Sequence, residues 1–194
     1  KILCKKCYET RKTAAPITLK TIFFQKILGF NRKAYWPMHF TSLVHGVEYI
    51  LIGVGTAPGI SFGCYIFANK ENPIIIGDYT IIAPNVLIGA FNHNPYDHRQ
   101  YIGKGGIKIG KYCWIGMNSC IVSGVELGDF TVVAAGSVVT KSFPEGYCII
   151  AGNPAKVIKK LDKNKCVKFE YEYKYHGYIP AEKFDNFRKR KLKI

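Results

Sequence analysis

Branched aliphatic residues recur at every sixth position along two stretches of the chain. Ile, Leu and Val together make up less than a quarter of the sequence, so this regularity over nine positions is not a chance pattern. The aliphatic positions are Ile76, Ile82, Ile88, Ile109, Ile115, Ile121, Leu127, Val133 and Val139.

A second rule accompanies the first, because the residue four positions after seven of these nine aliphatics is small or β-branched. That residue lies two before the next aliphatic, and positions two apart point to the same face of a strand. The pattern predicts short strands that alternate a large and a small inward side chain. The small positions are Thr80, Val86, Cys113, Ser119, Val125, Thr131 and Ser137.

Residues that tolerate unusual backbone angles follow each short strand. Glycine and asparagine adopt positive φ at low cost, so each strand is predicted to end in a tight corner, with Asn85, Asn118, Gly124 and Gly136 as examples. A strand and a corner every six residues form a coil that stacks on itself. Three such corners close a triangle of about eighteen residues.

The rhythm stops after Ile88 and resumes at Ile109, and the interval 89–108 is polar, aromatic and glycine-containing. We expect it to protrude as a loop, and loops on rigid scaffolds often carry function. It contains His93, a candidate general base, since imidazole can accept and return a proton near neutral pH. Asp97 either orients this imidazole or merely solubilises the loop. The remaining histidines are interpreted as surface or packing residues: His39, His45, His98 and His176.

The chain divides into a basic, helical extension at 1–50, the coil at 51–152, and a tail at 153–194. Within the extension, 18–30 has apolar residues near helical spacing, which predicts a helix that packs on the first coil or lies on a membrane. Asn153 and Pro154 predict the start of a capping helix through Leu161 that closes the open strand edge. The tail is expected to form a strand and a last helix from Pro180, and to join a neighbouring subunit.

The net charge of +15 on 194 residues resides at the two ends of the chain. Residues 1–35 carry nine Lys or Arg and one acid, 36–155 carry six against seven, and 156–194 carry thirteen against five. Such ends suit a phosphate-rich ligand, an anionic membrane surface or simple solubility. Seven cysteines without a disulfide-like pattern suggest a reducing, cytoplasmic setting. No run reaches the ~20 apolar residues needed to cross a bilayer.

The hexads resemble the hexapeptide-repeat acyltransferases, whose fold is a left-handed parallel β-helix, and within them the galactoside, maltose and surface-polysaccharide O-acetyltransferases. The likeness covers about residues 50–161. In that group an Ala-Pro-Asn stretch leads, eight residues after its Asn, to the catalytic histidine, and here Ala83-Pro84-Asn85 leads to His93 at the same spacing. The resemblance implies an all-β fold with acetyl-CoA as donor, no metal, a sugar or glycan acceptor, and a homotrimer.

The resemblance also implies a coenzyme A groove between neighbouring β-helices. Carried over by motif, it points to Trp114, Met117, Ala135, Thr140, Lys141, Lys156 and Lys159. Asn85 either contacts the acceptor or serves only as a corner. The expected mechanism is direct attack with His93 as base. A covalent route through Cys113 or Cys120 is the rival, although neither has a partner in the sequence.

The function that the sequence favours is O-acetylation of a sugar hydroxyl during surface-polysaccharide assembly, in the cytoplasm or peripherally at the inner membrane through the basic termini. Serine or xenobiotic acetylation and a non-catalytic β-helix scaffold are the alternatives. A carbonic anhydrase of the same fold needs three histidines on zinc, and the hexads from Ile109 onward contain none. Nucleic-acid binding has no support beyond charge.

Overall fold

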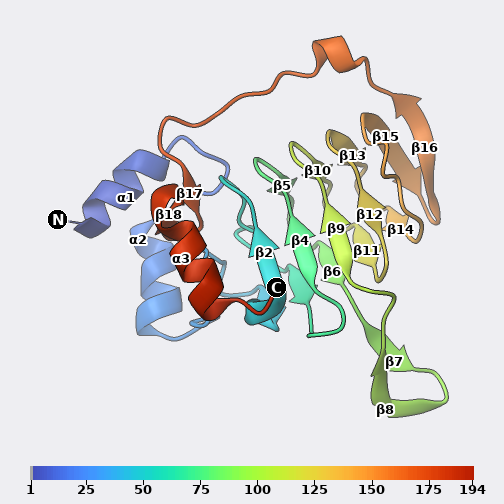
Figure 1. The fold of residues 1–194 in the computed structure, drawn as a ribbon, viewed down its shortest axis with the longest axis horizontal. Coiled ribbons are helices and arrows are strands. Elements are labelled where there is room, and N and C mark those ends of the chain that lie inside the picture. The colour runs from blue at the N-terminus through green and yellow to red at the C-terminus, as the bar shows by residue number, and fades with distance from the viewer. Residues whose placement is uncertain (1) are drawn as a thin grey trace.

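The computed structural model describes residues 2–194, with side chains from residue 5 onward. Its body is a stack of short strands arranged on three faces (Figure 1). The first face contains β1 (Leu43–His45), β3 (Tyr65–Phe67), β6 (Leu87–Gly89), β11 (Cys120–Val122) and β14 (Val138–Val139). The second contains β2 (Ile50–Ile52), β4 (Ile74–Ile76), β9 (Ile107–Ile109) and β12 (Glu126–Leu127). The third contains β5 (Ile81–Ile82), β10 (Trp114–Ile115), β13 (Thr131–Val133), β15 (Cys148–Gly152) and β16 (Ala155–Lys160).

The strand register shows the predicted eighteen-residue coil. Ile115 pairs with Val133 on the third face, and Ile121 pairs with Val139 on the first. The earlier coils are longer, because Ile52 pairs with Ile76. Apart from β16, the stacked strands on each face are parallel, so each coil covers the edge that the previous one leaves open.

The core has the composition that the hexads predict. All nine aliphatic positions are buried, as are all seven small positions, in one continuous column of side chains. The small residues are often hydroxyl-bearing because the hydroxyl bonds a corner carbonyl: Thr80 donates to Gly110 and Ser119 to Gly116. The four predicted corner residues have positive φ, from 56° at Asn85 to 82° at Gly124.

A second set of corners is aromatic, which the sequence analysis did not foresee. Tyr79, Tyr112, Phe130 and Tyr147 all have positive φ, and consecutive rings stack at 5.2, 4.8 and 5.1 Å between centroids. We call these four residues the aromatic ladder. A C-terminal strap, residues 161–174, runs back along this side of the stack, and Phe169 packs on two of the rings (Figure 1).

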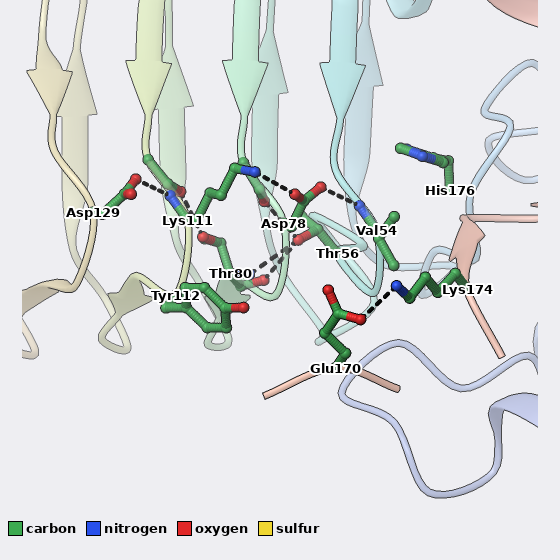
Figure 2. A network of polar contacts seen from close by, with 12 residues as sticks. Val54, Thr56, Asp78, Thr80, Lys111, Tyr112, Asp129, Glu170, Lys174 and His176 are labelled. Atoms are coloured by element: carbon green, nitrogen blue, oxygen red, sulfur yellow. Dashed lines mark hydrogen bonds and ion pairs between the residues drawn. The ribbon is translucent and has the colours of Figure 1, made fainter. Parts of the chain in front are cut away.

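Hydrogen bonds and an ion pair connect successive coils at these corners (Figure 2). The Asp129 carboxylate accepts from the Lys111 backbone N–H at 2.7 Å, and the Asp78 carboxylate accepts from that of Val54 at 2.8 Å. The Lys111 ammonium is 2.8 Å from Asp78. Partial burial alone would raise the pKa of Asp78, but the hydrogen bonds from Lys111 and Val54 outweigh it and hold that pKa below its usual value.

The helices gather at one end of the stack (Figure 1). They are α1 (Ile2–Thr10), α2 (Leu19–Ile22), a π-helix η1 (Phe23–Ile27), and α3 (Ala181–Lys191), with the 3₁₀ turn η2 (Val47–Tyr49). A second 3₁₀ turn, η3 (Lys163–Lys165), lies apart from them, in the strap that follows β16 (Figure 1). α2 and η1 together overlap the helix predicted over 18–30. The coil begins at β1, earlier than the predicted residue 51, because β1 pairs with β3.

The C-terminal tail returns to its own chain at this end. The hairpin of β17 (Tyr175–His176) and β18 (Ile179–Pro180) leads into α3, where the sequence predicts the last helix. Phe184 is buried and stacks on His176 at 3.7 Å, and the Gly55 backbone N–H donates to the Tyr175 carbonyl. The tail therefore covers the first coil of the same chain.

The prediction of a capping helix through Leu161 is wrong. β15 and β16 form an antiparallel hairpin instead, with Asn153 and Pro154 in its turn. A helix there would leave the last strand of the third face without a backbone partner, whereas β16 pairs with that edge directly. The open edge is covered, as expected, but by a strand.

The interval after Ile88 protrudes from the coil, as predicted (Figure 1). It is an ordered β-hairpin of β7 (Asn92–Asn94) and β8 (Asp97–Ile102), and the coil resumes at Ile107. We call it the catalytic hairpin because it holds the candidate base.

Candidate active site

His93 lies in β7, opposite Tyr101 in β8, with the two rings 4.7 Å apart. Its Nδ1 is 2.6 Å from the His98 carbonyl oxygen. A carbonyl can only accept a hydrogen bond, so the neutral ring carries its proton on Nδ1. The Nε2 atom is then the unprotonated nitrogen, which is the form that a general base requires.

His93 borders a groove of about 550 Å³ over the outward side of the first face, beneath the catalytic hairpin. Most of its lining is apolar or aromatic, which suits an acceptor with an apolar surface around its reacting hydroxyl. The lining residues are Leu43, Val44, His45, Phe67, Asn69, Leu87, Gly89, Phe91, Asn92, His93 and Tyr101.

His45 is a groove residue that the sequence analysis missed. It lies in β1, and its row continues through Phe67 to Gly89, where the catalytic hairpin begins. Each of these neighbours is 22 residues away along the chain. A separation of 22 residues is not a multiple of six, because the first coils are longer than the later ones. The hexad pattern therefore could not predict that His45, Phe67 and Gly89 are neighbours.

Asp97 does not contact His93. Its carboxylate bonds the Arg99 guanidinium at 2.9 Å and the Gln100 amide at 3.2 Å, within its own strand. The hydrogen bond from Arg99 holds the pKa of Asp97 below its usual range. The group that orients the imidazole is the His98 carbonyl.

Asn85 occupies a corner with a φ of 56°, and its backbone N–H donates to the Phe62 carbonyl. It precedes β6, whereas the catalytic hairpin follows the other end of that strand. Asn85 is not among the residues that line the His93 groove. Within one chain, the structure supports its backbone role.

The residues predicted to hold coenzyme A lie outside the groove, most of them along the third face and the corner beside it. Trp114 is exposed, and its row on the sheet continues through Val132 and Ile149 to Lys159. At the usual ~4.8 Å strand spacing this row is roughly 14 Å long. Met117 and Ala135 are exposed at equivalent corners of successive coils, and Lys156 is exposed in β16. Thr140 and Lys141 are also exposed, but they directly follow β14, at the far end of the first face.

These residues fit a nucleotide thioester. Trp114 and Val132 supply an apolar strip, and the lysines at the end of the row supply cations for phosphates. No ion pair within the described chain occupies Lys156 or Lys159. The predicted residues therefore lie on two sides of one molecule, with His93 over the first face and most of the coenzyme A candidates along the third.

The thiols are poorly placed for covalent chemistry. Burial raises the pKa of Cys113 to about 12, and its Sγ lies 3.3 Å from the Gly128 carbonyl. Burial also raises the pKa of Cys120. Because the thiolate is the nucleophile, both shifts disfavour attack by either sulfur.

A larger hollow of about 960 Å³ lies between α1, the β17–β18 hairpin and α3, and contains no predicted site residue. Its rim has charges of both signs, including Lys6, Glu9 and Arg190. The smaller groove is the candidate site because His93 lines it, whereas no histidine lines the larger hollow. Within the described residues, no cluster of His, Cys, Asp or Glu could hold a metal.

Comparison with known proteins places this geometry in a family. The family described as bacterial transferase hexapeptide, with six repeats, matches residues 106–141. A probable macrolide acetyltransferase of Lysinibacillus sphaericus is 42% identical over 144 residues, which is 74% of this chain and 66% of that protein. The galactoside O-acetyltransferase of Escherichia coli K12 is 39% identical over 133 residues, 62% of this chain and 63% of that protein. The chain thus spans slightly less than two thirds of either relative.

A third relative, the putative lipopolysaccharide biosynthesis O-acetyl transferase WbbJ of Escherichia coli K12, is 33% identical over 139 residues, 64% of this chain and 70% of that protein. Among solved structures, a maltose O-acetyltransferase from Clostridium difficile 630 superposes with a TM-score of 0.54 at 26% identity, over 84% of this chain and 90% of that one. A hexapeptide-repeat acetyltransferase from Vibrio cholerae, in complex with acetyl coenzyme A, gives 0.53 at 24% identity, over 83% and 86%.

A three-faced stack of hexads, a protruding histidine hairpin and these likenesses define a class of acyl-transferring β-helices. The chain belongs to the hexapeptide-repeat acetyltransferases. The resemblance drawn from the sequence is confirmed, and membership implies the left-handed coil.

Proposed function

We propose that the protein is an acetyl-CoA-dependent O-acetyltransferase that modifies a sugar hydroxyl during surface-polysaccharide assembly. The observation that carries the proposal is the His93 ring, whose Nδ1 is fixed on the His98 carbonyl and whose Nε2 is free beside an open groove. The family and its sugar-modifying relatives support the reaction class. Cysteines that are unpaired in the described chain support a cytoplasmic location.

In this proposal His93 moves the proton. Acetyl-CoA supplies an acetyl group on a thioester, so transfer breaks a C–S bond and forms a C–O bond. His93 Nε2 takes the hydroxyl proton as the acceptor oxygen attacks the acyl carbon, and the same nitrogen returns that proton to the departing sulfur. The His98 carbonyl stabilises the charged ring through its bond to Nδ1.

The donor is expected along the third face. Trp114 and Val132 would contact its apolar arm, the backbone at Met117 and Ala135 would border it, and Lys159 would meet a phosphate as a point charge. Lys156 lies in the same strand as Lys159, whereas Thr140 and Lys141 follow β14 on the first face and would meet the donor only from there. This fit is supported by the related fold that was solved with acetyl coenzyme A.

We further propose a homotrimer. The outward sides of the first and third faces expose large apolar residues, among them Leu43, Tyr65, Ile81 and Trp114. These two faces meet at the corner that contains Asn85 and Met117. Packing that corner against a second chain would cover both faces, and it would bring the His93 groove of one protomer towards the third face of another.

A second acceptor class follows from the groove itself. Three aromatic side chains, Phe67, Phe91 and Tyr101, line the groove, and a simple sugar has too little apolar surface to cover them all. The relative from Lysinibacillus sphaericus is named a probable macrolide acetyltransferase. O-acetylation of a large, largely apolar hydroxylated compound is therefore the second candidate. In that case the groove would bind the apolar ring and present one hydroxyl to His93.

A substrate panel tests the proposal. The purified chain is incubated with acetyl-CoA and, separately, glycan fragments, simple sugars, serine and a macrolide, and released thiol is measured. We expect acceptor-dependent thiol release that is highest with a glycan. Highest release with the macrolide would select the second candidate, and highest release with serine would exclude both. No release with any acceptor, together with no binding of coenzyme A, would indicate a scaffold.

A further inference from the structure

The helical segment formed by α2 and η1 buries the polar side chain of Gln25 against the protein and exposes several large apolar side chains to solvent. Gln25 is fully buried, and its amide donates to the Trp36 and Ala34 carbonyls at 2.9 and 3.2 Å. Its Oε1 accepts from the Tyr178 hydroxyl at 2.7 Å. The polar side of the segment is therefore fixed against the protein by hydrogen bonds.

The apolar side of the same segment faces solvent. Leu19, Phe23 and Ile27 are four residues apart, so they form one stripe on a helix. Leu19 and Ile27 are each 64% exposed. Leu28 and Phe30 are also exposed and extend the stripe. We call these five residues the N-terminal apolar surface.

Aromatic packing holds this surface in place. Phe23 packs edge-on against Phe24 at 5.6 Å between centroids, and Phe24 stacks on Phe40 at 4.5 Å. Phe30 contacts both Phe24 and Phe40. The exposed side chains therefore stand on a packed aromatic base, and their exposure does not result from a loose terminus.

The charge around this surface has one sign. Between Glu9 and Glu48 the sequence contains six Lys or Arg and no acid. Within the described chain none of these six forms an ion pair. The six cations are Arg11, Lys12, Lys20, Lys26, Arg32 and Lys33, and all except Lys12 and Arg11 lie within or directly beside the helical segment.

We propose that the N-terminal apolar surface docks on an anionic lipid bilayer, with α2 and η1 lying in the membrane plane. An apolar stripe flanked by unpaired cations is the arrangement that inserts at a lipid headgroup boundary. A second copy of this chain is a poorer occupant, because it would bring like charges together. No helix among the described residues is long and apolar enough to span a membrane.

Docking in this way leaves the proposed chemistry accessible. α2 lies at the helical end of the molecule, and the catalytic hairpin projects well away from it (Figure 1). The inference goes beyond the proposed function, and a binding assay without acetyl-CoA tests it alone.

Vesicle co-sedimentation tests the proposal with matched variants. The full chain is mixed with vesicles of phosphatidylcholine alone or of phosphatidylcholine with phosphatidylglycerol. We expect binding to the anionic vesicles only, and weaker binding at about 1 M salt, where the screening length falls to about 3 Å. Leu19→Gln/Ile27→Gln is expected to lower the partition coefficient at least ~10-fold. Ile158→Gln/Val167→Gln, which alters two similarly exposed residues elsewhere, should not lower it.

Three results would overturn the proposal. Wild-type chain that binds neither vesicle, or binds both equally, excludes an anionic bilayer as the occupant. Equal binding by the two double variants excludes this surface. A change in sedimentation mass on Leu19→Gln/Ile27→Gln would show that a second copy covers it instead. Circular dichroism verifies that each variant is folded.

Discussion

Histidines in this chain are distinguished by what their ring nitrogens contact. His93 has one nitrogen fixed on a carbonyl and the other free beside a groove. His176 has its Nδ1 on the Ile52 carbonyl, but its ring is stacked on Phe184, and burial lowers its pKa. His176 is therefore a packing residue whose Nδ1 has a hydrogen-bond partner, in agreement with the prediction from the sequence. Among the described histidines, His93 combines a ring fixed on a carbonyl with a place beside the groove under the hairpin.

At the same scale, Asp78 is expected to make stability depend on pH. Its folded-state pKa lies below the unfolded value of about 3.9, so the folded state binds fewer protons. The contribution of Asp78 to the free energy of unfolding is complete above the unfolded-state pKa and is lost as the pH falls through the folded-state pKa. Asp78→Asn should lower the free energy of unfolding by about 1 kcal/mol at neutral pH, because it removes the ion pair with Lys111.

Urea unfolding at pH 7 and near pH 3 measures this difference. Glu145→Gln is the control, since Glu145 is exposed and has no ion pair in the described chain. A gap between Asp78→Asn and wild type that stays constant with pH would show that the ion pair contributes nothing.

At the scale of elements, the hexads predicted the strands and the core because each hexad buries its own two inward residues. Position alone decides that burial, so Ile121 and Ser119 could be assigned from the sequence. The β15–β16 hairpin could not, because Asn153 and Pro154 fit a helix start as well as a turn, and the open sheet edge that decides between them is a tertiary feature.

The aromatic ladder was missed for a related reason. Tyrosine and phenylalanine rarely adopt positive φ, so nothing in the local sequence indicated corners at Tyr112 or Phe130. What stabilises these corners is stacking between coils and the strap that crosses them. Both are contacts between residues far apart in the sequence.

The strap provides an element-scale prediction. Phe169 packs on Tyr79 and Tyr112, and the Tyr112 hydroxyl donates to its carbonyl at 3.0 Å. Phe169→Ser should lower the free energy of unfolding by about 1 kcal/mol and speed proteolysis within 161–174. Val167→Ser, on the same segment but mostly exposed, should change neither. Equal protease sensitivity of the two variants would mean that the ladder does not hold the strap.

At the scale of the whole molecule, the candidate site residues lie on two faces of one chain. His93 borders the first face, and most of the coenzyme A candidates follow the third. Both groups of residues were named from the sequence. The hexad pattern predicts the fold of one chain, however, and contains no information on which surfaces of two chains are in contact. A trimer is the arrangement that would bring the two groups together and cover the exposed apolar faces.

Sedimentation equilibrium tests the assembly. We expect a mass three times that of the 21.8 kDa chain. Trp114→Asp should dissociate the trimer and weaken coenzyme A binding together, because a charge on the third face opposes burial between chains. A monomer that transfers acetyl at the full rate would contradict the divided site.

Turnover of His93→Ala is the direct test of His93 as the general base, using acetyl-CoA and the acceptor that gives the highest rate with the wild-type chain. His93 lies on the exposed catalytic hairpin, so the substitution is expected to leave the fold and coenzyme A binding intact. We expect a turnover at least ~100-fold below wild type, with Cys120→Ala near the wild-type rate. A His93→Ala enzyme that keeps its rate would exclude His93 as the base, and a Cys120→Ala enzyme that loses its rate would favour the covalent route.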